Sequence, residues 1–164
     1  MVYFFQNEKK KVDFINSAYK DQKRQSVDEA FQIIFSPYDN LVFDYTYWDD
    51  MVNFINNDLP KNAEKNWGNE NLETMIPSFH VTCCWVYNLN KKMVFKACDP
   101  NIIAVINPDI PDNVFSPLYK KRLMSFYINS GSTIIYVMGG TVHPTADINR
   151  QTKPRGYVFI GKIL

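Results

Sequence analysis

The spacing of hydrophobic and polar residues divides the chain into a helical first part and a β-rich second part. Residues 7–35 are rich in charged and helix-favouring residues without glycine or proline, which predicts one long, partly exposed helix. Pro37 removes a backbone donor and disfavours helical geometry before it, so we expect a kink or restart there. Apolar residues then recur every three to four positions up to Ile55, which predicts a second helix that ends before Pro60.

Alternation of apolar and polar residues begins at Val81 and predicts a sheet over residues 81–164. A helix that opens at Ser116-Pro117 and stops at Gly131 is expected to be inserted in it. We expect Gly139-Gly140 to form a turn between two strands. The five predicted strands are 81–88, 92–98, 133–138, 141–148 and 156–164.

This order of elements predicts an α+β fold with a five-stranded, mostly antiparallel sheet and flanking helices. An interrupted helical segment over residues 7–58 precedes the sheet, which is the layout of PAS-like sensor domains. A chain of 164 residues buries roughly 70% of its unfolded surface, so we expect one domain over residues 1–164.

Charge and hydropathy narrow the classes of partner. Eighteen basic residues against 17 acidic ones give a net charge of +1, which argues against nucleic-acid binding. No run approaches the roughly 18 apolar residues of a membrane-spanning helix. The chain stops at Leu164 inside an apolar run, which favours an excised domain over a complete protein.

The histidines and cysteines do not form a recognisable catalytic or metal site. His80 and Cys84 would lie about 13 Å apart on an extended strand, too far for a catalytic dyad. No second ligand is spaced to share a metal with His143, and the three cysteines lack a CxxC motif. We therefore expect no catalytic residue, no metal and no cofactor.

The disulfide state of the cysteines stays open at this stage. Strand alternation points Cys83 and Cys84 to opposite faces, which disfavours a bridge between them. Cys98 approaches Cys83 diagonally across the predicted hairpin, near the upper distance limit for a bridge. Three free thiols, or one bridge and one thiol, are both compatible with the sequence.

Aromatic residues supply the candidate ligand site. At about 100° per residue, Asp44 lies about 40° from Trp48 on the apolar face of the predicted second helix. One hypothesis makes Asp44 a structural hydrogen-bond acceptor, and the other makes it part of a pocket for a cationic ligand. Trp85 and Tyr87 share one strand face and are either core or pocket lining. The candidate ligand-binding residues are Asp44, Tyr45, Trp48, Trp85 and Tyr87.

The chain also resembles the fourth class of CHASE domains, the extracellular sensory modules of membrane-bound histidine kinases and diguanylate cyclases. The resemblance rests on Asp-Tyr-Thr-Tyr-Trp-Asp-Asp at residues 44–50, which is similar to the family's Asp-Tyr-x-x-Trp-Asp-Asp helix. The connector at 66–72, the hairpin at 86–94 and the closing Pro-Arg-Gly strand at 154–162 also resemble that family. Asn88 and Lys91 depart from it at two turn positions, where Asp and Gly are usual.

The resemblance implies an extracytoplasmic, non-enzymatic sensor domain that is tethered to a membrane in its full-length protein. It would bind a small molecule and pass the signal through the long first helix, with a homodimer through residues 7–35 as a possible partner arrangement. The alternative is a dimerisation or protein-interaction domain without a small-molecule ligand. A pocket at Asp44, Trp48 and Trp85 would favour the sensor, and a packed interior there would favour the alternative.

Overall fold

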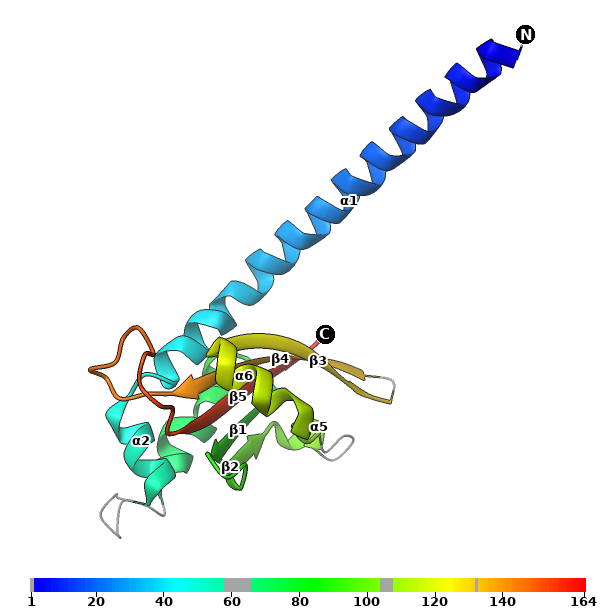
Figure 1. Ribbon diagram of the computed structural model, residues 1–164. Helices are drawn as coiled ribbons and strands as arrows, with labels where there is room; N and C mark the ends of the chain where they lie inside the picture. Colours follow the sequence, from blue (N-terminus) through cyan, green and yellow to red (C-terminus); the bar gives the residue numbers. More distant parts are fainter. Residues whose placement is uncertain (1, 58–65, 104–107, 132) are drawn as a thin grey trace. The chain divides into compact units, whose positions relative to one another are not determined.

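The computed structural model describes residues 2–57, 66–103, 108–131 and 133–164. These residues fall into two compact units, residues 1–37 and residues 38–164, which are described separately. Helix α1 (Val2–Tyr45) supplies all of the described first unit and the opening of the second (Figure 1).

Helix α1 continues through Pro37, so the expected restart at this proline is wrong. A proline inside a helix leaves the carbonyl four residues earlier, here that of Ile33, without its helical donor. Ile33 is 76% exposed, and Pro37 is exposed as well, so water can satisfy that carbonyl. The helix therefore tolerates a proline that would break a buried one.

The interruption lies nine residues later, inside the segment predicted as the second helix. Helix α1 ends at Tyr45, and α2 (Asp49–Asn56) begins after Trp48, whose backbone is extended at φ −153° and ψ 125°. Asn57 closes α2 in the left-handed conformation, with φ at 58°. The apolar face of α2 is buried through Met51, Phe54 and Ile55.

The second unit contains one antiparallel sheet of five strands in the order β2-β1-β5-β4-β3, which confirms the predicted α+β class. The hairpin of β1 and β2 and the closing strand β5 lie where the alternation predicts them. The strands are β1 (Cys83–Asn88), β2 (Met93–Cys98), β3 (Leu123–Ser130), β4 (Thr133–Val142) and β5 (Gly156–Ile163).

The middle of the sheet differs from the prediction. The inserted helix α6 (Phe115–Lys121) is short and ends at Arg122, so the residues up to 130 form strand β3 and not helix. Gly131, at φ +66°, makes the turn, while Gly139 and Gly140 lie inside the continuous strand β4. The two glycines permit close packing on both faces, because an added Cβ would lie 2.7 Å from the Phe159 ring or 2.8 Å from Val42.

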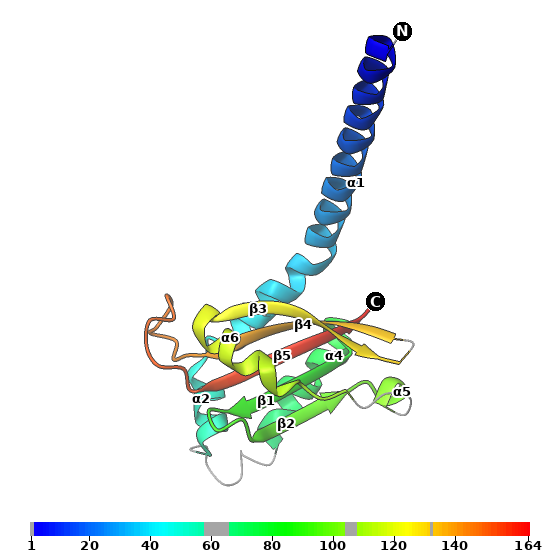
Figure 2. The ribbon, with the colours of Figure 1, turned by 45° about the vertical axis from the view of Figure 1, so that its right-hand side comes forward.

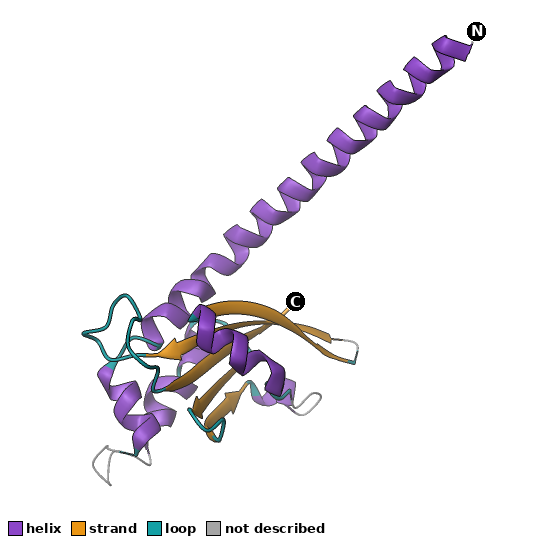
Figure 3. Ribbon diagram, viewed as in Figure 1, coloured by secondary structure: helices purple, strands orange, loops and turns teal. Residues whose placement is uncertain are grey.

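Helices cover both faces of the sheet (Figures 2 and 3). Helix α6 crosses one face, where Phe115 and Leu118 pack on Phe159 in a continuous apolar core. The end of α1, helix α2 and helix α4 cover the other face (Figure 2). The short connecting elements are η1 (Asn69–Glu73), α4 (Met75–Ser78), α5 (Pro100–Ile103) and η2 (Asp112–Val114).

Candidate functional site

The corner between α1 and α2 carries three of the five predicted site residues. Asp44 and Tyr45 are the last two residues of α1, and Trp48 precedes the first residue of α2. Asp44 is exposed, so its predicted place inside the apolar face is wrong. The predicted rotation of 40° requires one continuous helix, and the chain leaves the helix between Asp44 and Trp48.

Trp48 belongs to a row of aromatic rings on the α2 face of the sheet. Its ring centroid lies 5.1 Å from that of Trp67 and 6.1 Å from that of Tyr45, which meets it edge-on at 86°. Phe54 continues the row, with centroid distances of 4.7 Å to Trp67 and 6.1 Å to Phe95. Tyr45 and Trp48 are only half-buried, so this aromatic row, Tyr45–Trp48–Trp67–Phe54–Phe95, has an end open to solvent.

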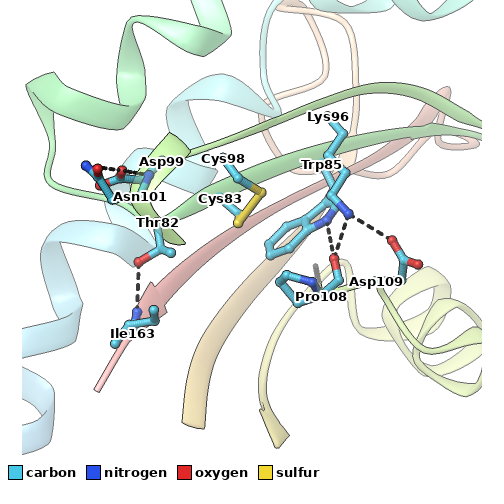
Figure 4. Close-up of a disulfide and its surroundings, with 10 residues drawn as sticks. All are labelled: Thr82, Cys83, Trp85, Lys96, Cys98, Asp99, Asn101, Pro108, Asp109 and Ile163. Atoms are coloured by element: carbon cyan, nitrogen blue, oxygen red, sulfur yellow. Dashed lines mark hydrogen bonds and ion pairs between the residues drawn. A yellow bond between two sulfur atoms is a disulfide. The ribbon is translucent and has the colours of Figure 1, made fainter. Parts of the chain in front are cut away.

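Trp85 and Tyr87 lie on the opposite face of the sheet, in the core beneath α6. Trp85 is completely buried and its indole Nε1 donates to the Pro108 carbonyl at 3.1 Å (Figure 4). Tyr87 meets the Phe115 ring edge-on at 5.1 Å. The five predicted residues therefore do not line one pocket: three lie at the helix corner and two in the core behind the sheet.

Arg150 fastens the end of α1 to the loop between β4 and β5. It is 6% exposed, and its Nη2 donates to Thr46 Oγ1 at 2.7 Å and to the Phe43 carbonyl at 3.2 Å. Its Nη1 donates to the Thr141 carbonyl, and its guanidinium carbon lies 4.9 Å from the centre of the Phe43 ring. A cation at a helix C-terminus satisfies carbonyls that have no helical donor.

Buried His143 and half-buried Asp147 lie in hydrogen-bond contact in the same loop. His143 Nδ1 lies 2.8 Å from Asp147 Oδ2, and its Nε2 lies 2.9 Å from Thr141 Oγ1. Burial lowers the pKa of His143. The Thr152 hydroxyl, which donates to Asp147 at 2.6 Å, holds the pKa of that carboxyl well below its usual range. Neutral His143 therefore donates from Nδ1 to ionised Asp147.

The same loop also holds the start of α2. The backbone N–H of Thr145 donates to Asp49 Oδ1 at 2.9 Å, and the backbone N–H of Asp49 donates to Thr145 Oγ1 at 3.2 Å. The His143 N–H donates to the Thr46 carbonyl at 2.9 Å. We call residues 43–49 together with residues 141–152 the corner clamp, because contacts from Arg150, His143 and Thr145 join the α1–α2 corner to the end of the sheet.

A family model for the CHASE4 domain matches residues 30–164. The chain belongs to the CHASE4 domain family. Members of this family are sensory domains in signalling proteins, and CHASE domains are generally extracellular. A search of curated protein sequences gave no significant match.

In this CHASE4 domain, the Asp-Tyr-Thr-Tyr-Trp-Asp-Asp motif forms the corner itself. Tyr45 and Trp48 supply the open end of the aromatic row, and Asp49 supplies a contact of the corner clamp. Asp44 and Asp50 are exposed. The sequence alone does not identify Arg150 as the main partner of the motif. Arg150 lies about 100 residues from the motif, in a segment whose sequence predicts only a turn.

A disulfide joins Cys83 and Cys98 of the CHASE4 domain (Figure 4). Cys84 is a buried thiol. This settles the open choice in favour of one bridge and one thiol, although the expected diagonal geometry is wrong. The pairing of Tyr87 with Met93 alone would place Cys83 opposite Ala97, but a bulge after Val86 shifts the register by one residue. Cys83 then lies directly opposite Cys98, with a Cα–Cα distance of 4.0 Å. Burial raises the pKa of Cys84 to about 12, so this thiol is a poor nucleophile.

A cleft of about 510 Å³ lies at the opposite end of β5 from the corner. Its polar lining combines Lys162, Asp99 and Thr82 with the exposed His80. Within the described ranges, no cluster of three or more His, Cys, Asp or Glu residues could hold a metal ion. Among the same residues, no helix is long and apolar enough to cross a membrane.

Proposed function

We propose that this CHASE4 domain is the extracytoplasmic, ligand-binding sensor of a membrane-bound signalling protein such as a histidine kinase or diguanylate cyclase. The observation that carries the proposal is the corner clamp. Arg150 and His143 bond the last turn of α1 to the loop after β4, so a displacement of the sheet end acts on α1 directly. A sensor needs such a connection between its ligand site and its output element.

The Cys83–Cys98 bridge supports the extracytoplasmic part of the proposal. Disulfides form and persist in oxidising compartments and are rare in the cytosol. The membrane tether would be supplied by segments outside the described residues.

The open end of the aromatic row is the proposed place of ligand contact. Tyr45 and Trp48 present half-buried rings, and Asp44 and Asp50, which lie within two residues of them in the sequence, are exposed. Aromatic faces beside carboxylates favour a cationic or amine-bearing small molecule through cation–π and ion-pair contacts. Trp85 and Tyr87 act in this proposal from the core, by holding the sheet, and not by touching the ligand.

A thermal-shift screen of the chain against amines, amino acids, organic acids, nucleotides and sugars tests the proposal. A ligand at 100 times its dissociation constant adds about 2.7 kcal/mol, which raises the Tm of a domain of this size by about 5 °C. We expect an amine-bearing hit that disappears in folded Trp48→Ala and persists in Lys162→Met. The reverse pattern would move the site to the cleft at Lys162, and a flat screen would count against a small-molecule sensor.

The second candidate function is a dimerisation domain without a small-molecule ligand. It is favoured by the apolar side chains that α1 exposes in the first unit, among them Phe14 at 74% and Ile33 at 76%. Such residues favour contact with a second helix. Sedimentation of Phe14→Asp against the parent chain would test it, since loss of a ligand-independent dimer is the expected result.

A further inference from the structure

The sheet has two edges, and they differ in how they are protected. Strand β2 forms one edge and β3 the other. Natural proteins block pairing at an edge with lysines, prolines, bulges or short strands. Strand β2 has only six residues, and its pairing with β1 shifts register after Val86.

Strand β3 has none of these protections. Its eight residues, Leu-Met-Ser-Phe-Tyr-Ile-Asn-Ser, contain neither a charge nor a proline. It pairs with β4 without a register shift from Leu123 to Ser130. Strand β3 is therefore a long, regular and uncharged edge strand with which another strand can pair.

The hydrogen bonds at the ends of the hairpin show which β3 residues face outward. The Thr141 N–H donates to the Arg122 carbonyl at 2.9 Å, so the even-numbered residues of β3 bond to β4. A second hydrogen bond leads to the same assignment. The Leu164 N–H donates to the Ile134 carbonyl at 3.0 Å, so the backbone groups of Ile134 point to β5 and not to Asn129, its partner on β3. The outward backbone groups of β3 therefore belong to Leu123, Ser125, Tyr127 and Asn129. Within the described part of the chain, these groups have no hydrogen-bond partner.

We propose that β3 is an association surface on which a second copy of this chain adds its own β3 in antiparallel order. An uncharged strand can pair with itself about a twofold axis without opposing like charges. Addition of β3 to the β2 edge of a second copy would give an open-ended array, and the short, irregularly paired β2 opposes it. The twofold contact is therefore the closed arrangement that the two edges permit.

A register centred on Phe126 uses all of the outward groups. It places Ser125 opposite the partner's Tyr127, and Leu123 opposite the partner's Asn129. Tyr127 is 55% exposed and leans on Tyr136 of β4, with ring centroids 5.5 Å apart. Pairing would cover this exposed ring and join the two sheets into one of ten strands.

Amide hydrogen exchange at increasing concentration of the intact chain tests the proposal residue by residue. The amides of Ser125, Tyr127 and Asn129 are expected to exchange freely when dilute and to slow by about tenfold or more when concentrated. The amides of Met124, Phe126 and Ile128 should be protected at every concentration, because they bond to β4. A dimer formed through α1 would not produce this alternation.

Ser125→Lys is the blocking variant, since a lysine on an edge strand opposes pairing. It should abolish the concentration-dependent protection of Tyr127 and Asn129, whereas Ser78→Lys on α4 should leave it unchanged. Free exchange of the three odd-numbered amides at every concentration would overturn the proposal. The same result would leave the proposed ligand sensor untouched, because the corner clamp lies elsewhere in the domain.

Discussion

At the scale of single residues, Arg150 is the most informative side chain of the domain. Burial of a guanidinium is costly unless its donors are satisfied. Here both Nη groups donate, to the Phe43 and Thr141 carbonyls and to the Thr46 hydroxyl, while Nε has no hydrogen-bond partner among the described residues. No carboxylate of the described residues bonds to it directly, so the end of α1 is the main partner of the cation. Loss of this side chain would leave buried carbonyls without donors.

Arg150→Met should therefore destabilise the fold by about 3 kcal/mol, because several charge-assisted hydrogen bonds are lost together. Urea unfolding followed by circular dichroism measures the change. Arg155→Met is the matched control, since Arg155 is exposed and only its backbone bonds to Val142. Equal stability of the two variants would show that the Arg150 side chain does not stabilise the end of α1.

His143 gives the fold a defined pH dependence. Its pKa is lowered in the folded chain by burial, so the unfolded chain binds the proton more readily. Stability should therefore fall as the pH drops below the ordinary histidine value of about 6.5. The lowered pKa of Asp147 adds a further loss, which begins only near pH 4 and continues below it.

The prediction is a smaller stability at pH 5.5 than at pH 7.5 in the parent chain, with the difference reduced in His143→Gln. Urea midpoints at the two pH values measure it. His80→Gln should keep the parent's difference, because His80 is exposed. A parent chain with the same midpoint at both pH values would contradict the assignment of His143 as a buried neutral imidazole.

At the scale of elements, local patterns predicted the hairpin and the closing strand well, and the middle strands and the breaks poorly. The alternation that begins at Val81 predicts the β1–β2 hairpin, and the closing apolar run predicts β5. Pro37 and Gly139-Gly140 look like breaks in the sequence, yet each lies inside a regular element. The helix tolerates Pro37 because that turn is exposed to solvent, and β4 requires the two glycines because other side chains pack closely on them. Neither property can be derived from neighbouring residues in the sequence.

The candidate site shows the same division. Helical spacing identified Tyr45 and Trp48 as site residues, but it did not predict that helix α1 ends between them. The hydrogen bonds from Arg150 to Thr46 join residues far apart in the chain, and no local spacing encodes them. The bulge in the hairpin also decides which cysteines meet, and its presence depends on the pairing of both strands.

Gly140→Ala tests the packing interpretation of the glycine pair. The added methyl group would lie 2.8 Å from both Val42 Cγ1 and Thr46 Cγ2, so we expect a destabilisation of about 2 kcal/mol. Gly131→Asn is the control, because that turn position has open space and asparagine tolerates a positive φ. If neither change alters the Tm, the close approach of α1 to the sheet does not explain the glycine at position 140.

The disulfide should stabilise the hairpin mainly through the unfolded chain. Cys83 and Cys98 are separated by 15 residues, and closing a loop of that length is worth about 3 kcal/mol. Reductant should lower the unfolding midpoint of the parent chain and leave that of the Cys83→Ala, Cys98→Ala double variant unchanged. A parent midpoint that is insensitive to reductant would show that the bridge does not form in solution.

At the scale of the whole molecule, the family and the clamp lead to one account of signalling. A CHASE4 domain is a sensory module, and here the end of α1 is bonded to the same loop that holds the start of α2. Ligand binding shifts an equilibrium only if the ligand prefers one of two states. A ligand on Tyr45 and Trp48 would distinguish two arrangements of this corner, and α1 would carry the difference onward.

Hydrogen exchange of the chain with and without a hit from the ligand screen tests this account most directly. The account predicts altered protection at Trp48 and also along α1 before Phe43, because the corner clamp transmits the change into the helix. A change that is confined to the α2 side of the corner, with α1 exchanging as in the free chain, would contradict it.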